Sequence, residues 1–480
     1  MLGVLLDEGM NVARLNFSHG DHAGHEGTIT RLKQALEKRP GVHCAIMLDT
    51  KGPEIRTGFF DASVKDKLLK LKKGSTLILT SDYEHKSTGE KLGCTYGKLS
   101  SSCKPGAQIL CADGSLVLEV SKVLNETEVA CTVLNDCAIG ERKNMNLPGV
   151  VVDLPVLQDK DTRDLQEFAC KQPVDFVAAS FVQSADDVRT IRKVLDDAGG
   201  KHVRIISKIE NQEGLENFEA ICKETDAVMV ARGDLGMEIP PERVFREQKK
   251  MITVCNREGI PVIVATQMLE SMCSNPRPTR AECSDVANAV LDGADAVMLS
   301  GETAGGNFPK ESVAIMARTC LEAEAELDFT KVYETELALS RKKGQFSVVE
   351  ATVAAAVQAA RDARAAAVVV LAKTGATAQL FAKYKLSVPL IVVTSDIAVA
   401  RYSQAVVPGC KALCLPDCTE YGYAHASGKD ETKMVAEGTK YARSLGIVAN
   451  GDDVLLALHS YRVADEKNMA MRFFHASSVL

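Results

Sequence analysis

Short apolar runs, each followed at once by polar residues, recur along the first two thirds of this chain. Nearly continuous apolar runs suit strands that are covered on both faces, as in parallel sheets. Amphipathic segments with helical spacing, such as 186–197, 242–258 and 282–292, separate several of them. This alternation predicts βα units that form a parallel sheet or a barrel. The runs cover residues 12–15, 44–48, 176–180, 204–209, 227–231, 261–265 and 296–299.

The polar residues that follow the runs carry most of the chemically reactive side chains in this part of the chain. In a (β/α)8 barrel the active site is built at the C-terminal ends of the strands. The sequence therefore predicts an α/β fold whose main domain is a (β/α)8 TIM barrel. Seven runs are found where a closed barrel has eight strands, so one strand is expected to be missing from the chain.

Two segments interrupt this pattern. Residues 53–153 contain short alternating runs and the turn dipeptide Asp113-Gly114, which predict a small inserted all-β domain. After residue 328 an alanine-rich helix at 349–360 precedes strand-like runs at 367–371, 390–394, 411–415 and 454–458, which predict a separate α/β domain. The expected division is 1–53 and 154–328 for the barrel, 54–153 for the inserted β-barrel domain and 329–480 for the C-terminal domain.

Composition excludes several classes of function. The formal net charge is -7 and basic residues come only in short runs, so nucleic acid is not an expected partner. No apolar run reaches the roughly 20 residues that a membrane helix needs, and no signal peptide is recognised. Fifteen cysteines without a framework predict reduced thiols and a cytoplasmic location. The spacings of Cys410, Cys414 and Cys418, and of His19, His22 and His25, leave a metal site open but favour a buried strand and a solvated helix start.

The run at 204–209 leads into Lys208-Ile209-Glu210, and the run at 227–231 leads into Asp234. Alternate residues of a strand share a face, so Lys208 and Glu210 point the same way. On its own, a Lys–Glu pair at a solvated sheet edge is an equally good interpretation. Two carboxylates from neighbouring strand ends beside one lysine predict a site for a hard cation that faces a phosphorylated or enolic substrate.

The other strand ends carry residues of the same kinds. Arginine and lysine favour phosphate, whereas neutral and carboxylate oxygens favour cations. Both chemistries occur side by side, and six such endings are hard to explain as ordinary loop composition. The endings include Arg14, Asn16 and Ser18, then Asp49-Thr50-Lys51-Gly52-Pro53-Glu54-Ile55-Arg56, then Thr266-Gln267, then Ser300-Gly301-Glu302-Thr303.

At these residues the sequence resembles the pyruvate kinase family closely. The similarity extends over nearly the whole chain and follows the order of the family's motifs. The matching blocks are residues 9–20, 48–58, 208–214, 231–240, 265–272, 275–294 and 299–303. The resemblance implies a phosphotransferase of glycolysis that transfers the phosphoryl group of phosphoenolpyruvate to ADP, giving pyruvate and ATP.

The resemblance also implies a role for each matching residue. Arg14 and Lys208 would bind the phosphoryl group, with Gly233, Asp234 and Thr266 also contacting the substrate. Thr266, through water reaching Ser300, would deliver a proton to the enolate carbon. Glu210 and Asp234 would hold Mg²⁺ or Mn²⁺; Asn16, Ser18, Asp49 and Thr50 would hold K⁺; and Asn16, His19, Arg56 and Lys143 would bind the nucleotide.

The resemblance extends to domain motion, assembly and ion dependence. The inserted β domain would close as a lid that excludes water, and the enzyme would be a homotetramer with no membrane partner. In this family a glutamate at the position of Glu54 accompanies dependence on K⁺, and without a cation Glu54 and Asp49 are expected to leave negative charge unbalanced.

Two departures from the family pattern are visible. The strand that normally precedes the block at 9–20 is absent, and it is the expected missing barrel strand. Losing about four buried aliphatic side chains would cost about 6–12 kcal/mol, so the chain is expected to be poorly stable. The effector loop of many relatives is only partly matched by Ala372-Lys373-Thr374-Gly375-Ala376-Thr377, so the effector stays open.

Two other functions remain as alternatives at this point. A barrel lyase or aldolase that stabilises an enolate on Mg²⁺ would need Glu210 and Asp234, but it would have no use for Asp49, Thr50 or the inserted domain. A non-catalytic relative would keep the motifs without activity.

Overall fold

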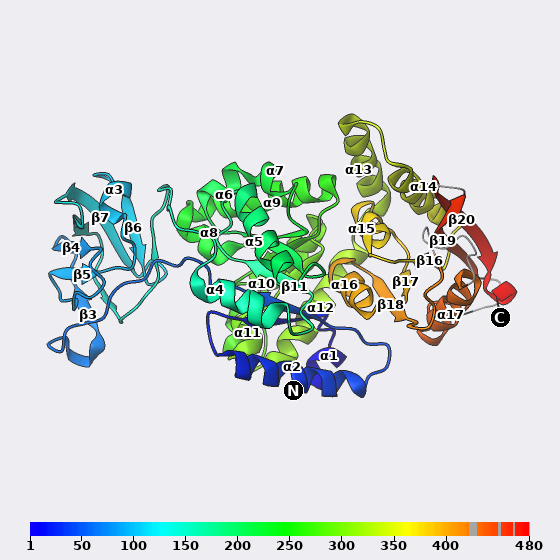
Figure 1. Ribbon diagram of the computed structural model, residues 1–480, viewed down its shortest axis with the longest axis horizontal. Coiled ribbons are helices and arrows are strands. Elements are labelled where there is room, and N and C mark those ends of the chain that lie inside the picture. The colour runs from blue at the N-terminus through cyan, green and yellow to red at the C-terminus, as the bar shows by residue number, and fades with distance from the viewer. Residues whose placement is uncertain (422–429, 450–452, 464–465, 480) are drawn as a thin grey trace.

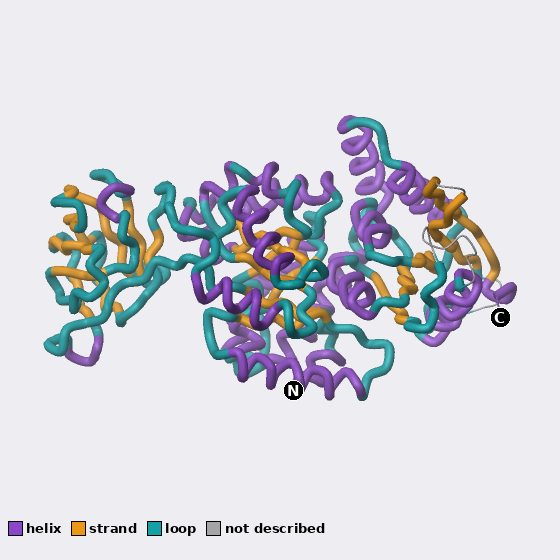
Figure 2. The backbone as a smooth tube through the Cα atoms, viewed as in Figure 1, coloured by secondary structure: helices purple, strands orange, loops and turns teal. Residues whose placement is uncertain are grey.

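The computed structural model describes residues 1–421, 430–449, 453–463 and 466–479. Three bodies follow one another along the long axis of the molecule (Figure 1). The inserted β domain lies at one end, a helix-covered parallel sheet lies in the middle, and the C-terminal domain lies at the other end. Figure 2 shows the strands of the middle body surrounded by helices and loops. Among the described helices, none is both long and apolar enough to cross a membrane.

The middle body is a curled sheet of seven parallel strands, and each of the seven apolar runs forms one of them. Neighbouring strands pair in the order β1-β2-β11-β12-β13-β14-β15. In the described ranges no eighth strand joins β1 to β15, and both outer strands are only partly buried whereas β2, β11 and β13 are fully buried. The bounds are β1 Val12–Asn16, β2 Ala45–Asp49, β11 Phe176–Ala179, β12 Arg204–Ile209, β13 Ala227–Ala231, β14 Val262–Ala265 and β15 Ala296–Met298.

Helices cover the outer face of this sheet, and several begin at a side-chain cap. Ser184 and Thr279 accept backbone N–H groups at the starts of α5 and α10, and Asp187 and Glu282 complete the two capping boxes. The α-helices of this body are α1 Leu2–Asp7, α2 His22–Glu37, α4 Asp159–Arg163, α5 Ala185–Asp197, α6 Gln212–Glu216, α7 Phe218–Ile221, α8 Arg232–Glu238, α9 Pro241–Glu258, α10 Arg280–Leu291, α11 Gly301–Ala304 and α12 Pro309–Ala325. The short helices are η2 Asp164–Ala169, a π-helix, and η3 Glu270–Cys273, a 3-10 helix.

The inserted domain is built on a six-stranded, mainly antiparallel sheet with the order β10-β6-β7-β8-β4-β5. Leu77, Leu79, Leu116 and Leu118 are fully buried in its own core, which the alternating pattern predicts. The elements are η1 Lys65–Lys67, β3 Leu69–Leu71, β4 Thr76–Thr80, β5 Lys91–Gly93, α3 Leu99–Ser102, β6 Gln108–Cys111, β7 Leu116–Val123, β8 Glu128–Val133, β9 Cys137–Ile139 and β10 Met145–Asn146.

The C-terminal domain contains a five-stranded sheet with the order β18-β17-β16-β19-β20, parallel except for the β19–β20 pair. The four predicted strand runs are confirmed, whereas β20 was not predicted. The elements are α13 Phe329–Lys343, α14 Val348–Asp362, β16 Ala367–Leu371, α15 Ala376–Lys383, β17 Leu390–Thr394, α16 Ile397–Val406, β18 Cys410–Cys414, α17 Glu431–Ser444, β19 Val454–Val463, β20 Glu466–His475 and η5 Ala476–Val479.

The C-terminal domain packs against the N-terminal ends of the barrel strands. One apolar cluster joins Met47, Phe176 and Ile206 of the barrel to residues of β16 and α16. Arg401 donates to both carboxylate oxygens of the buried Asp175, and Arg204 at the start of β12 donates to the carbonyl of Thr374 at 2.6 Å. The opposite end of the strands therefore faces the inserted domain and is free for a site.

Candidate active site

Strand β12 delivers Lys208 and Glu210 to the C-terminal end of the sheet, on the same face of the chain. Ile209, between them, packs into the core on the other side. The Nζ of Lys208 lies 2.9 Å from Oε1 of Glu210, and both side chains are almost completely buried. The backbone N–H of Phe181 donates to Oε2 of Glu210 at 2.7 Å. Phe181 adopts φ 58°, a costly conformation for a bulky residue, and this turn brings its N–H to the carboxylate.

Asp49 joins three strands of the sheet through its side chain. Its Oδ2 accepts from Nε of Arg14 at 2.6 Å, and its Oδ1 accepts from Nζ of Lys208 at 3.1 Å. Ser180, at the end of the neighbouring run, accepts from Lys208 at 2.7 Å and donates to the carbonyl of Thr50 at 2.8 Å. The structure thus brings Arg14, Asp49 and Lys208 together as one buried cluster of charges.

Asp234 lies in the short helix α8, directly after β13. The helix is fixed at its start, where the N–H of Gly233 donates to Oγ1 of Thr266 at 2.7 Å. Arg232 donates to the Thr266 carbonyl at 2.7 Å and to Asp285 at 2.7 Å. Thr266 itself has φ 70°, so the chain leaves β14 in a left-handed conformation that turns the hydroxyl toward α8. Ser300 follows β15, the strand that pairs with β14.

The charges of this cluster shift one another's pKa values. Burial would lower the pKa of Lys208, but the carboxylates of Asp49, Glu210 and Asp234 outweigh it and raise that pKa well above its ordinary value. Burial raises the pKa of Glu210 to about 7, with the charge of Asp234 adding to the effect and Lys208 opposing it. Burial also raises the pKa of Asp234, whereas Lys208 and Arg14 hold the pKa of Asp49 below its ordinary value despite burial.

Glu54 and Asp49 do not carry the unbalanced charge that the sequence suggested. Glu54 pairs with Arg56 at 2.5 Å, and Asp49 lies between Arg14 and Lys208. The interpretation was wrong because both carboxylates have basic partners in the structure, and the sequence pattern does not show these pairings. The residues predicted to hold K⁺ are therefore candidates through their oxygen atoms, and the paired charges of Glu54 and Asp49 do not add to that argument.

A cavity of about 600 Å³ lies between the inserted domain and the barrel. Three of the predicted site residues line it: Arg56 and Lys143 from the inserted domain and Asp234 from α8. Glu238 and Asn146 also line it, and they are absent from the sequence prediction. The volume is in the range of pockets that hold a nucleotide-sized ligand.

The four residues predicted to hold K⁺ lie at the C-terminal ends of two paired strands. Asn16 and Asp49 are the last residues of β1 and β2 and are direct partners in their register. Oδ1 of Asn16 accepts from the N–H of Ser18 at 3.0 Å, and Oγ1 of Thr50 accepts from the N–H of Ser180 at 3.1 Å. His19 is exposed, next to this group, and is not among the cavity residues. In this conformation the four residues predicted to bind the nucleotide therefore do not lie around one cavity.

Comparisons with known proteins agree with this geometry. Residues 1–313 match the family model of the pyruvate kinase barrel domain, and residues 350–470 match that of the pyruvate kinase alpha/beta domain. The chain belongs to the pyruvate kinase family. A pyruvate kinase of Eimeria tenella is 46% identical over 458 residues, which are 95% of this chain and 83% of the relative. A cytosolic isozyme of Glycine max is 45% identical over 95% of this chain and 89% of the relative.

Solved pyruvate kinases share the fold as well as the sequence. The crystal structure of the Cryptosporidium parvum enzyme superposes with a TM-score of 0.90 at 43% identity and covers 99% of this chain and 92% of its own. The same enzyme in complex with ADP superposes with a TM-score of 0.85 at 42% identity, with the same two coverages. Membership in the pyruvate kinase family makes the chain a phosphotransferase, and the lyase or aldolase alternative is thereby removed.

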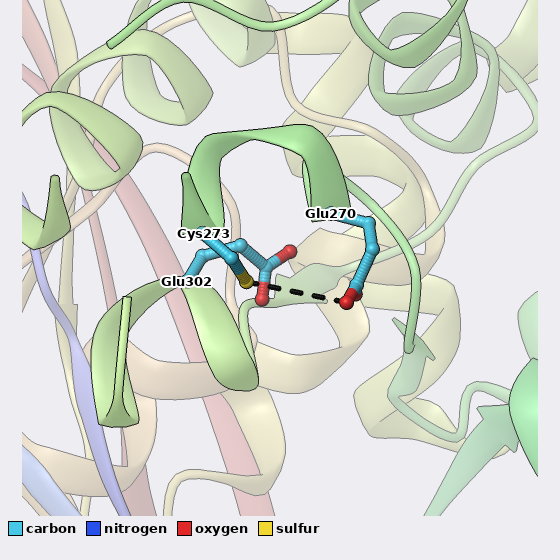
Figure 3. Close-up of side chains that lie close together, drawn as sticks. All are labelled: Glu270, Cys273 and Glu302. Atoms are coloured by element: carbon cyan, nitrogen blue, oxygen red, sulfur yellow. Dashed lines mark hydrogen bonds between the residues drawn. The ribbon is translucent and has the colours of Figure 1, made fainter. Parts of the chain in front are cut away.

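A second group of ligand-type side chains lies close to Ser300, where Glu270, Cys273 and Glu302 come together (Figure 3). Both carboxylate oxygens of Glu302 are already used, since they accept the N–H groups of Leu269 at 3.0 Å and Ser300 at 2.7 Å. Glu302 therefore ties the loop after β14 to the loop after β15. Its function here is to hold the turn that carries Ser300.

Several residues of the candidate site were missed by sequence reasoning. Ser180 ends a run that was recognised as a strand, so its polar end could have been counted with the others. Asp161 accepts the N–H groups of Lys51 and Gly52 and fixes the loop after β2, but no local pattern marks it. The cysteine and histidine spacings noted in the sequence have structural explanations. Cys410 and Cys418 are buried, and His22, at the start of α2, pairs with Asp164 at 2.8 Å.

Proposed function

We propose that the buried cluster of Lys208, Glu210 and Asp49 is the catalytic centre at which this chain transfers the phosphoryl group of phosphoenolpyruvate to ADP, the last step of glycolysis. The observation that carries the proposal is Lys208, which lies between two buried carboxylates at the C-terminal end of the sheet. A buried, permanently charged ammonium stabilises negative charge most where water is excluded.

Arg14 and Lys208 are proposed to bind the phosphoryl group. Both are held by Asp49, so they reach the substrate already oriented. Lys208 offsets the charge that spreads over the phosphoryl oxygens in the transition state. Thr266 is proposed to supply the proton for the enolate carbon, with water linking it to Ser300. Its hydroxyl lies at the start of α8, where it accepts the N–H of Gly233 and donates to the carbonyl of Ala265.

Glu210 and Asp234 fit a divalent metal. Within the described part of the chain Oε1 of Glu210 has no well-aligned hydrogen-bond donor, although Lys208 lies 2.9 Å away, and burial makes both carboxyls reluctant to ionise without a cation. Two buried carboxylates with free acceptor capacity are the ligands that Mg²⁺ or Mn²⁺ prefers. The metal, when bound, would neutralise charge on the substrate oxygens. Asn16, Ser18, Asp49 and Thr50 offer oxygen ligands for K⁺.

The cavity between the two domains is proposed to take ADP, together with Asn16, His19, Arg56 and Lys143. A relative of the same fold is described in complex with ADP, which supports this choice. Closure of the inserted domain, with limits near residues 54 and 153, would bring these residues together. The proposed barrel limits are 1–53 and 154–328, and the C-terminal domain at 329–480 is the proposed place for an effector.

Assembly and location are proposed from the family. A homotetramer is the expected state, with phosphoenolpyruvate and ADP as the small-molecule partners. A cytoplasmic location is supported by relatives named as cytosolic isozymes and by fifteen cysteines that form no disulfide.

The test is a coupled assay of pyruvate formation with the purified chain, phosphoenolpyruvate, ADP, Mg²⁺ and K⁺. Asp234→Asn and Glu210→Gln are expected to lose turnover and to need about 10-fold or more Mg²⁺ for half-saturation, because each removes a charged ligand. Glu242→Gln, an exposed change four residues beyond α8, is the matched control. A folded wild-type chain without ATP formation would favour the non-catalytic alternative.

A further inference from the structure

The lid domain, residues 54–153, contacts the metal-binding helix α8 at that helix's last turn. Nδ2 of Asn146, in β10, donates to Oε1 of Glu238 at 2.9 Å. A residue of the last strand of the lid domain thus binds a side chain of the barrel.

A second contact reinforces the first. The turn at residues 112–114 lies against α8, since a Cβ added to Gly114 would be 3.3 Å from Cε of Met237. Ala112, Asp113 and Gly114 all have φ between 54° and 79°, so this turn is held in a left-handed conformation that non-glycine residues rarely adopt. The lid domain therefore contacts α8 at two successive residues, Met237 and Glu238.

Helix α8 is held at both ends. Its start is fixed to the barrel by the bond from the Gly233 N–H to Thr266, and its end is fixed to the lid domain by Glu238. Asp234 lies between the two anchors, one helical turn before Glu238, and residues four apart lie on the same face of a helix. The position of the Asp234 carboxylate therefore depends on both anchors.

The Asn146–Glu238 hydrogen bond is largely shielded from solvent. Asn146 is only 7% exposed, and Glu238 is half-buried. Among the described residues no basic side chain forms an ion pair with Glu238, so the amide of Asn146 is the donor that stabilises its carboxylate. Removing one donor leaves a partly buried carboxylate with fewer partners, which costs more than the bond itself contributes.

We propose that Glu238 is a positioning residue that ties the lid domain to α8 through Asn146 and so holds Asp234 in place for the divalent cation. The inference rests on the metal role proposed above for Asp234. Residues that orient metal ligands without touching the metal commonly matter about 10–100-fold for metal affinity. The contact is present in the conformation described here, so it holds Asp234 before any further closure of the lid domain.

The experiment compares Asn146→Ala, Glu238→Ala, Glu238→Gln and the double variant Asn146→Ala/Glu238→Ala. Mn²⁺ affinity is measured without substrates, from the electron paramagnetic resonance signal of free Mn²⁺, and hydrogen exchange is followed at 145–147. Both alanine variants are expected to weaken Mn²⁺ binding about 10-fold and to speed exchange, and the double variant should equal a single one. Glu238→Gln keeps an acceptor oxygen for the Asn146 amide, so it should stay within about twofold of wild type.

Two controls keep the result specific. Glu242→Ala removes an exposed glutamate four residues beyond Glu238 and should change nothing. Urea unfolding of each variant confirms that the protein is folded under the binding conditions. In the assay, the alanine variants should raise the Mg²⁺ needed for half-saturation more than they alter KM for ADP.

Other outcomes overturn the proposal. If Glu238→Gln binds Mn²⁺ as weakly as Glu238→Ala while Asn146→Ala binds normally, the charge of Glu238 matters and the bond to the lid domain does not. Unchanged affinity in all four variants makes the contact merely structural. If Asp234→Asn also leaves Mn²⁺ affinity unchanged, the proposed metal site itself is wrong; a loss in Asp234→Asn alone refutes only the positioning role.

Discussion

The raised pKa of Glu210 makes the stability of the metal-free protein depend on pH in an unusual direction. Burial, supported by the charge of Asp234, raises the pKa of Glu210 from 4.5 to about 7 in the folded chain. Between these two pH values the folded protein holds a proton that the unfolded chain has released. The free energy of unfolding therefore falls as pH rises from about 4.5 to about 7, and it changes no further above that.

The size of this effect follows from the two pKa values. A shift from 4.5 to about 7 corresponds to about 3 kcal/mol of lost stability once the group is charged. Asp161, Asp175, Asp234 and Glu238 also have raised pKa values, so the whole protein shows a sum of several groups. The contribution of Glu210 is isolated by comparing wild type with Glu210→Gln, which cannot ionise.

The assay is urea unfolding in EDTA at pH 5 and pH 8. Wild type is expected to lose up to about 3 kcal/mol more than Glu210→Gln between these pH values. Adding Mg²⁺ should restore wild type at pH 8 and do little at pH 5, because the metal binds the ionised carboxylate. Equal pH dependence in the two proteins would show that Glu210 is ionised throughout, and that its pairing with Lys208 outweighs burial.

Lys208→Met is expected to lower kcat by about a thousandfold or more, while KM for phosphoenolpyruvate changes much less. The reason is that the charge of Lys208 acts mainly in the transition state. Near-normal turnover would remove Lys208 from the mechanism. Activity is expected to rise strongly from K⁺-free buffer to K⁺ buffer. Glu54→Lys, which also frees Arg56 from its partner, should weaken that rise. Equal wild-type rates with and without K⁺ would leave the oxygen ligands without a role. Joining a family-like strand ahead of the chain should place an eighth strand between β1 and β15. The melting temperature in calorimetry is expected to rise, because each newly buried side chain contributes about 1.5–3 kcal/mol. An unchanged Tm would show that the open sheet edges need no partner.

The fold could be predicted largely because buried parallel strands leave a strong local signal. The runs at 204–209, 227–231, 367–371 and 390–394 match β12, β13, β16 and β17 residue for residue. β20 was missed because its pairing with β19 is a tertiary property, and its polar start, Glu466-Lys467-Asn468, resembles a surface segment. The count of seven runs predicted a sheet one strand short of a closed barrel, and only the family pattern indicated which strand that is.

The candidate site could be predicted as a set of residues but not as a network. Strand ends meet at one edge of a parallel sheet, so Arg14, Asp49 and Lys208 could be grouped before their contacts were known. That Asp49 lies between the two cations could not be read from spacing, since these residues are 35 and 159 positions away from it. The contact of Asn146 with Glu238 spans 92 positions and joins two domains, and no local pattern records it.

Strand β12 connects two regions that the sequence keeps far apart. Arg204 at its start lies over the ring of Tyr402 and donates to the carbonyl of Thr374, a residue 170 positions away, whereas Lys208 and Glu210 stand at its other end. Six extended residues span about 20 Å, so one stiff segment runs from the C-terminal domain to the strand end that carries Lys208 and Glu210. The loop at 372–377 therefore contacts the strand whose other end carries the proposed catalytic lysine. A substitution in this loop is expected to be felt at Lys208, even though the loop lies in another domain.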